Sequence, residues 1–364
     1  MKDVTMRCPK ATFPVLVTFA ICCVPVSVAA TPDPPPSESP QPSADETQPS
    51  AEETWDPSAK PTGDASPDEP EEGRFLRLAR DDAGSPVALE AALVHCAPKD
   101  GGETGPTVDL ISAVHVAEKD YYRELNRLFA GYDAVLFELV APEGTRIPQG
   151  GVRPSGNPVS MLQNAMTEVL KLQFQLEGID YTAENFVHAD MSPEEFADSM
   201  RRRGESVFQV FLRMLGYAMA RQAQEPGGGG DFRLFLALFD KNRALAIKRV
   251  LAEQFEDLEG SLNAIEGPEG STLISERNKV ALKVLREQIA SGKQKLAIFY
   301  GAGHMSDFEQ RLADDFGLAP VSTRWLTAWD LKAEPTPATP DRPPPSPKPT
   351  GSTTTPPSPA DVAP

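Results

Sequence analysis

The sequence predicts an α/β domain with a mixed, partly parallel sheet, flanking helices and a helical insertion. Three short apolar runs carry this prediction, at residues 107–115, 134–138 and 295–300. The first two are separated by residues 119–130, which have helical spacing, so they indicate a strand, a helix and a second strand. A crossover of this length joins parallel neighbours in a right-handed sense, so we expect both strands to point the same way.

An antiparallel hairpin is expected ahead of this unit. Residues 74–78 and 87–96 alternate or run apolar, and the sequence DDAGS between them is typical of a turn. A glycine-rich loop at 99–105 then leads to the strand that begins at Thr107. Because a hairpin precedes the parallel strands, the sheet should be mixed.

Helices are expected to fill most of residues 158–254, as an insertion or cap over the sheet edge. Apolar residues recur at helical spacing from Leu162 to Leu176, from Val207 and from Leu234. The sequence SPEE at 192–195 supplies an N-cap, a first-turn proline and a capping-box glutamate.

The end of the domain is predicted as helix, strand, helix and strand. A helix over 276–290 leads into the apolar run at 295–300. A helix over 307–316 and an edge strand over 321–328 then close the domain.

The chain of 364 residues divides into four parts by composition. Residues 1–30 have the basic start, apolar core and small residues of a secretory signal, or alternatively of an uncleaved membrane anchor. Residues 31–72 are an acidic, proline-rich stretch that cannot bury a core, and the tail at 333–364 is rich in proline and threonine; both are expected to be disordered. Residues 73–332 remain for one folded domain. From the predicted signal we expect the protein to be secreted or held in the periplasm or cell envelope.

The acidic charge of the chain belongs mainly to the linker. Residues 31–72 hold 12 acidic residues and one basic residue, a net charge of −11 out of −18 for the whole chain. The domain is therefore only mildly acidic, and it has no basic stripe that would favour nucleic acid as a partner. The domain has one cysteine, Cys96, so no disulfide can form within it, and a small buried residue is expected there.

Three candidate site residues end the three apolar runs. His115 ends the first run, Glu138 ends the second, and His304 follows the third through the sequence GAG. Strand ends at the carboxyl edge of a parallel sheet are where open α/β folds bind ligands. Imidazole and carboxylate suit Zn²⁺, Mn²⁺, Co²⁺ or Fe²⁺, and three protein ligands leave a position open for water.

The alternative for each histidine alone is a structural role. We expect that role for His95, which lies within a strand, whereas His115 and His304 together with Glu138 favour a divalent metal ion such as Mn²⁺, Co²⁺ or Zn²⁺. The sequence has no H-E-x-x-H motif and no nucleophile elbow.

Four segments resemble the TraB/Tiki family, the TraB and GumN group, over about residues 75–330. They are VDLISAVHV, AVLFELV, SERN at 275–278 and YGAGHM. The family has two G-x-x-H motifs and a glutamate, and a fold shared with erythromycin esterase-like and ChaN-like proteins. The second motif is present at 301–304, Glu138 matches the glutamate, and in the first motif Ser112 replaces the glycine ahead of His115.

The resemblance implies a metal-dependent hydrolase, a peptidase that acts on peptide or protein substrates. The alternative is a non-catalytic protein of the pheromone-shutdown type that binds and sequesters peptides. His115 and His304 would hold the ion, and Glu138 would be either the third ligand or the general base. Arg277 would either orient a substrate carboxylate or form an ion pair at the start of a helix. Glu118 would be either a general base or an acid in the first turn of a helix. His188 would line the site or act as a fourth ligand.

Overall fold

The computed structural model describes residues 73–99, 105–150, 170–206, 230–266 and 270–332. The predicted signal at 1–30, the linker at 31–72 and the tail at 333–364 lie outside these ranges. So do residues 158–169 and 207–229 of the predicted insertion.

The described elements follow one another in this order: β1 (Leu76–Arg80), β2 (Pro86–Pro98), β3 (Thr107–Ala113), β4 (Val116–Ala117), α2 (Lys119–Phe129), β5 (Ala134–Phe137), β6 (Gln173–Phe174), α4 (Gln175–Gly178), β7 (Phe186–His188), α5 (Pro193–Arg203), α7 (Gly230–Ala237), α8 (Arg243–Glu266), the π-helix η1 (Thr272–Glu276), α9 (Arg277–Ala290), β8 (Lys295–Gly301), the 3-10 helix η2 (Ala302–His304), α10 (Met305–Asp315) and β9 (Leu318–Asp330). The hairpin, the first strand–helix–strand unit and the closing helix and strand are therefore confirmed.

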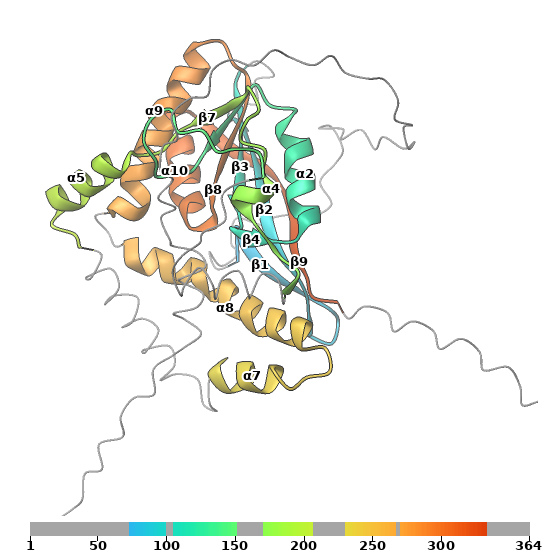
Figure 1. Ribbon diagram of the computed structural model, residues 1–364. Coiled ribbons are helices and arrows are strands. Elements are labelled where there is room, and N and C mark those ends of the chain that lie inside the picture. The colour runs from blue at the N-terminus through green and yellow to red at the C-terminus, as the bar shows by residue number, and fades with distance from the viewer. Residues whose placement is uncertain (1–72, 100–104, 151–169, 207–229, 267–269, 333–364) are drawn as a thin grey trace, which may run out of the picture. The chain divides into compact units, whose positions relative to one another are not determined.

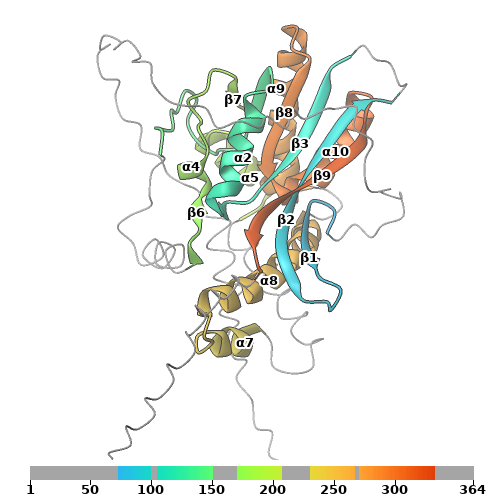
Figure 2. The same ribbon diagram turned by 90° about the vertical axis from the view of Figure 1, so that its right-hand side faces the viewer.

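Seven strands of the described chain form one mixed sheet (Figures 1 and 2). The strand order is β1-β2-β3-β8-β5-β7, and β9 pairs with β2 along its length. β3, β8, β5 and β7 are parallel to one another, whereas β1, β2 and β9 pair antiparallel. The predicted mixed sheet is confirmed.

The prediction that the first two parallel strands are neighbours is wrong. β8 lies between β3 and β5 and pairs with both, so that Phe299 is opposite Ile111 on one side and Phe137 on the other. A β-strand buried on both faces suits the apolar run of β8, and five of its seven residues are completely inaccessible. The strand that carries His304 is thus central among the three strands that carry the candidate residues.

The described part of the predicted insertion is not purely helical. Lys171 has a positive φ of 56°, which a helix does not accommodate, and the chain then pairs as β6 with β4. β7 joins the main sheet parallel to β5, with His188 opposite Phe137. The capping box at Ser192 is present at the start of α5, as predicted.

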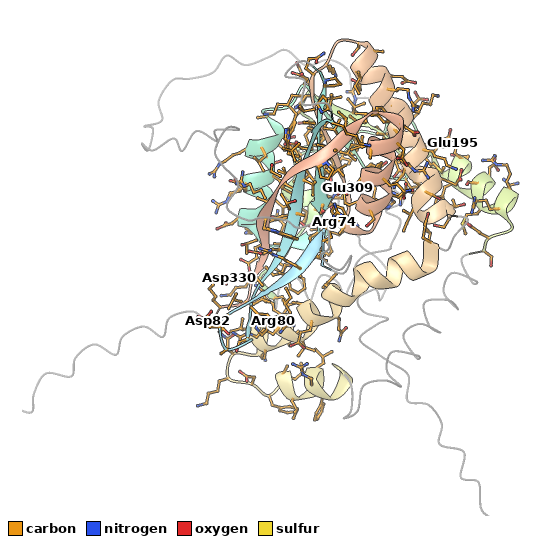
Figure 3. All side chains as sticks on the ribbon, turned by 180° about the vertical axis from the view of Figure 1, so that it is seen from behind. Arg74, Arg80, Asp82, Glu195, Glu309 and Asp330 are labelled. Carbon is orange, nitrogen blue, oxygen red and sulfur yellow. The ribbon has the colours of Figure 1, made fainter. Side chains whose placement is uncertain are left out.

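Helices cover both faces of the sheet (Figure 1). On one face α2 packs on the sheet through Tyr122, Leu125 and Phe129, and α8 extends the same core with Leu251 and Phe255. On the other face α9 and α10 pack through a second core, which includes Leu282, Leu285, Phe308 and Leu312. Arg74, just before β1, pairs with Glu309 on α10 (Figure 3).

His95 and Cys96 have structural surroundings, as predicted. The Asp109 carboxylate, 3% exposed, lies 2.5 Å from His95 Nδ1 and accepts a hydrogen bond from the Tyr132 hydroxyl. The hydrogen bond between His95 and Asp109 raises the pKa of His95 above its ordinary value. Burial raises the pKa of the Cys96 thiol to about 12. A thiol with such a pKa is protonated and unreactive at neutral pH.

His95 should therefore stabilise the fold more at low pH than at high pH. Because its pKa is raised on folding, its contribution is complete below its unfolded pKa of about 6.5 and is lost as the pH rises through the folded value. Urea unfolding of the wild type and His95→Gln at about pH 5.5 and about pH 8.5 should show a larger difference in unfolding free energy at the lower pH. An equal difference at both values would contradict the role of the Asp109 contact.

Candidate functional site

The carboxyl ends of the four parallel strands meet at one edge of the sheet. Glu138 directly follows β5, His115 lies two residues beyond β3, and His304 ends the 3-10 turn after β8. Asp190 lies two residues beyond β7. The chain direction of the parallel strands therefore brings these four side chains to the same edge.

Gly301, the last residue of β8, lies at the centre of the cluster. A Cβ atom placed on it would be 3.4 Å from Glu138 Oε2, 3.8 Å from His115 Nε2 and 3.8 Å from His304 Cδ2. The structure thus brings together the three residues that the sequence predicted as metal ligands. These are ordinary van der Waals distances, so a Cβ atom at Gly301 would fill part of the space between the three side chains, which the glycine leaves open.

Glu138 is held at both of its oxygens. Arg277 Nη2 donates to Oε1 at 2.7 Å, and the Gly301 amide donates to Oε2 at 2.7 Å. Burial by itself would raise the pKa of Glu138, but the Arg277 charge, the two imidazoles and the Gly301 amide outweigh it and hold the pKa well below its usual range. Glu138 is therefore a carboxylate at any pH near neutrality.

Arg277 is buried between two carboxylates. Its Nε and Nη2 atoms donate to the two oxygens of Asp190, at 2.9 and 2.6 Å, and Nη2 also reaches Glu138. Burial opposes the charged form, but the two carboxylates raise the pKa of Arg277 well above its ordinary value. One guanidinium thus faces two carboxylates, which leaves one negative charge in excess beside the two imidazoles.

The two imidazoles are alike in their contacts. His304 Nδ1 lies 2.7 Å from Asn278 Oδ1, and its Nε2 lies 3.6 Å from Glu138 Oε1. His115 Nδ1 lies 2.8 Å from Gln175 Oε1. Burial, partly opposed by the Glu138 charge, lowers the pKa of His304 to about 4, so this side chain is neutral at pH 7.

Three other residues singled out in the sequence, His188, Glu118 and Ser112, have different surroundings. The Nε2 atom of His188 lies 2.6 Å from the Leu139 carbonyl oxygen, so this nitrogen donates to the backbone. Glu118 is the N-cap residue of α2 and accepts from Lys248 Nζ at 2.7 Å and from the Asp330 amide. Ser112 is fully buried in β3, and its hydroxyl finds no hydrogen-bond partner among the described residues.

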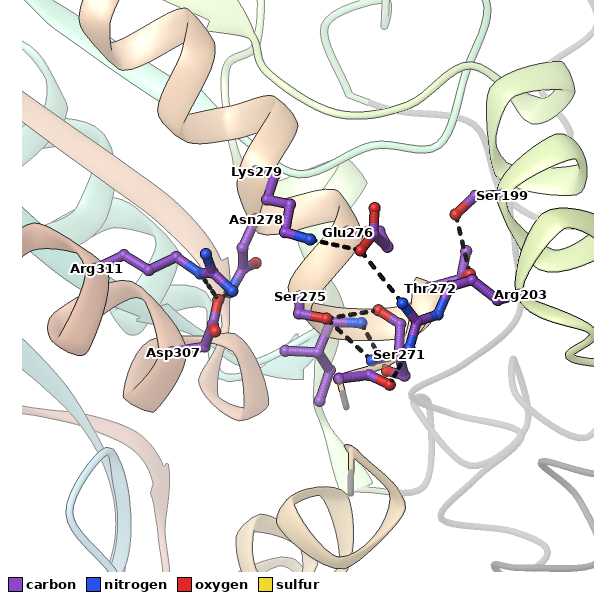
Figure 4. Close-up of polar contacts among 12 residues, drawn as sticks. Ser199, Arg203, Ser271, Thr272, Ser275, Glu276, Asn278, Lys279, Asp307 and Arg311 are labelled. Atoms are coloured by element: carbon purple, nitrogen blue, oxygen red, sulfur yellow. Dashed lines mark hydrogen bonds and ion pairs between the residues drawn. The ribbon is translucent and has the colours of Figure 1, made fainter. Parts of the chain in front are cut away.

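The π-helix η1 directly precedes Arg277 and Asn278 in the chain and sets where α9 begins. Figure 4 shows the polar contacts around η1. The Glu266 carboxylate accepts from the Ser271 hydroxyl and from the amides of Ser271 and Ser275, which fixes the first turn of η1. From α5, Ser199 forms a buried hydrogen bond with Thr272, and Arg203 pairs with Glu276. π-helical segments are rare and often occur at functional sites.

Gly270 makes this turn possible. Its φ is +73°, and a Cβ atom there would lie 2.3 Å from the Ser275 hydroxyl oxygen. Gly270→Ala should therefore combine backbone strain of about 1–2 kcal/mol with a steric clash. Gly204→Ala is a matched control, because its φ is +66° but its Cβ would meet nothing within 4 Å. Urea unfolding should show the larger loss for Gly270→Ala, and equal losses would contradict a clash at η1.

Two residues of the site are missing from the sequence prediction. Asp190 follows a strand of only three residues, β7, and the signal that could have found it is the apolar FV pair ahead of His188. Gln175 follows β6 and has no pattern that marks it, because its role depends on the contact with His115 from a distant part of the chain.

The donor chemistry of the cluster fits a divalent cation. Two imidazoles and a carboxylate converge, and the cluster carries an excess negative charge that a cation would balance. The separation of 3.6 Å between His304 Nε2 and Glu138 Oε1 is close to the ~3.4 Å expected between two ligand atoms on a tetrahedral ion. As they stand, however, no three His, Cys, Asp or Glu side chains in the described ranges form a complete metal-binding group.

Comparison with protein-family models, with curated proteins and with solved structures finds no match for this chain. Among the residues that the structure describes, no helix is both long enough and apolar enough to cross a membrane.

Proposed function

We propose that this protein is an exported, metal-dependent hydrolase that acts on peptide or protein substrates. The observation that carries the proposal is the convergence of His115, Glu138 and His304 around Gly301 at the carboxyl edge of the sheet. The resemblance to the TraB/Tiki family supports the substrate class, and an erythromycin esterase-like or ChaN-like fold is part of the same proposal.

His115 and His304 would hold the ion through Nε2, with Glu138 as the third ligand. A bound divalent ion supplies a Lewis acid and lowers the pKa of a water molecule to about 7. The low pKa of Glu138 favours the ligand role over the base role, because a carboxylate far below its usual pKa accepts a proton poorly. Arg277 and the Gly301 amide hold the carboxylate in place.

Arg277 serves first to orient Glu138. It is 8% exposed and already bound to two carboxylates, so the predicted clamp on a substrate carboxylate would need one of these pairs to open. The ion-pair alternative accounts for all of its contacts to Glu138 and Asp190.

A peptide-binding protein without catalysis is the second candidate. It is favoured by one observation: both carboxylates considered as a general base are held in ion pairs, Glu118 with Lys248 and Glu138 with Arg277. Such a protein would need no metal.

Metal content separates the two candidates. The purified full chain, dialysed against Mn²⁺, Co²⁺ or Zn²⁺, should hold about one ion per chain, and His304→Ala should lose it. His188→Ala is the control, because its Nε2 contacts a backbone carbonyl and not the cluster. Wild-type protein that binds peptides but retains no metal after each dialysis would favour the binding protein.

A further inference from the structure

His115 and His304 each contact a side-chain amide, and the orientation of each amide decides where the imidazole carries its proton. A neutral imidazole has one N–H donor and one bare acceptor nitrogen, and only the bare nitrogen can bind a metal ion. The hydrogen bond made by the other nitrogen selects between the two tautomers.

The orientation of Asn278 is determined by its own surroundings. Its Nδ2 donates to the His304 carbonyl oxygen at 3.1 Å and to Asp307 Oδ2 at 2.8 Å, and both of these atoms are acceptors. The nitrogen must therefore face them, so that Oδ1 faces His304 Nδ1 at 2.7 Å. An amide oxygen only accepts, so Nδ1 of His304 must be the donor.

Gln175 has a related arrangement around His115. Its Oε1 faces His115 Nδ1 and its Nε2 faces the Tyr181 hydroxyl oxygen, each at 2.8 Å. A hydroxyl can accept as well as donate, so this orientation of the amide is compatible with a proton on His115 Nδ1. The Gln175 backbone also donates to the His115 carbonyl at 2.8 Å, and its side chain is buried. Gln175 therefore has little freedom to turn away from the imidazole.

The segment that carries Gln175 is anchored on α2. The Asn126 side chain donates to the Gly178 carbonyl and accepts from the Asp180 amide. Gly178 itself packs so closely on Tyr122 that a Cβ atom there would come within 2.4 Å of the ring. The amide of Gln175 is thus presented to His115 from a fixed backbone.

We infer that Gln175 and Asn278 are positioning residues that hold His115 and His304 with the proton on Nδ1, so that both present a bare Nε2 to the space beside Glu138. With Nδ1 protonated, Nε2 of His304 and Oε1 of Glu138 are two acceptors 3.6 Å apart, an arrangement that a cation between them would stabilise. The inference rests on the proposed function for its purpose, but the tautomers themselves are a property of the metal-free protein.

Nitrogen-15 NMR of the metal-free full chain, labelled at histidine, tests the tautomers directly. The chain has only four histidines. The signals of His95 and His188 are identified by their loss in His95→Gln and His188→Gln. The signal of His304 is identified by its loss in His304→Ala, and the remaining signal belongs to His115. In free neutral histidine the proton lies mostly on Nε2, so the opposite tautomer at both sites requires a specific partner. We expect His115 and His304 each to show a protonated Nδ1 and a bare Nε2.

Two variants of Gln175 test the cause. Gln175→Met removes the acceptor at similar volume, and His115 should then shift toward the Nε2–H tautomer while His304 is unchanged. Gln175→Glu keeps an acceptor and should retain the Nδ1–H tautomer. Metal affinity, measured by competition with a chelator, should fall about 10–100-fold in Gln175→Met.

The outcomes separate the inference from the proposed function. A bare Nδ1 on either His115 or His304 in the wild type would overturn the inference, whether or not metal binds. Unchanged tautomers in Gln175→Met would overturn the role of Gln175. Both Nδ1 atoms protonated in a protein that binds no metal would support the inference and overturn the proposed hydrolase.

Discussion

Glu138→Gln is expected to abolish both metal binding and hydrolysis. The amide is a poorer ligand than the carboxylate, and its NH₂ group would face one of two donors, Arg277 Nη2 or the Gly301 amide. Bound metal should fall from about one ion per chain to almost none, and peptide hydrolysis by at least about 10²-fold. Metal analysis and initial rates on a panel of peptides measure both effects.

Glu118→Gln is the matched control for this change. It removes the other carboxylate considered as a base, which is bound to Lys248 and to the Asp330 amide at the start of α2. Metal and activity should both remain. Glu138→Gln protein that keeps its metal but hydrolyses slowly would assign Glu138 as the base, and full activity at saturating metal would leave Glu138 a structural residue.

Arg277→Met should be the most destabilising substitution at the site. It leaves Glu138 and Asp190 buried side by side without their cation, and the Asp190 side chain is completely inaccessible to solvent. Removal of one partner from a buried ion pair costs about 3–5 kcal/mol. Urea unfolding of the metal-free protein measures the loss of unfolding free energy without any contribution from a bound ion.

Two further variants show whether burial is the reason. Arg311→Met breaks the ion pair with Asp307, in which the two side chains are 28% and 23% exposed. This substitution should lower the unfolding free energy by less than about 1 kcal/mol. Arg277→Lys keeps the charge but cannot reproduce the two-pronged contact with Asp190, so an intermediate loss is expected. Similar losses for Arg277→Met and Arg311→Met would contradict a special role for the buried cluster.

Several elements could be predicted from the sequence because they depend on neighbouring residues. The helical spacing of α2, the capping box of α5 and the apolar runs of β3, β5 and β8 are local patterns. Elements of two or three residues, such as β6 and β7, are too short for such a pattern, and η1 depends on Glu266 and Gly270 rather than on the spacing of apolar residues.

The sequence by itself determined that His115, Glu138 and His304 follow apolar strands, and chain direction in parallel strands then places them at one edge. Only the tertiary structure decided the rest. It inserted β8 between β3 and β5, brought Asp190 against Arg277, and placed Gln175 and Asn278 against the two imidazoles. These contacts join residues from 26 to 87 positions apart. They arise from strand pairing and from the satisfaction of buried polar groups across the whole domain, and local periodicity carries no information about either.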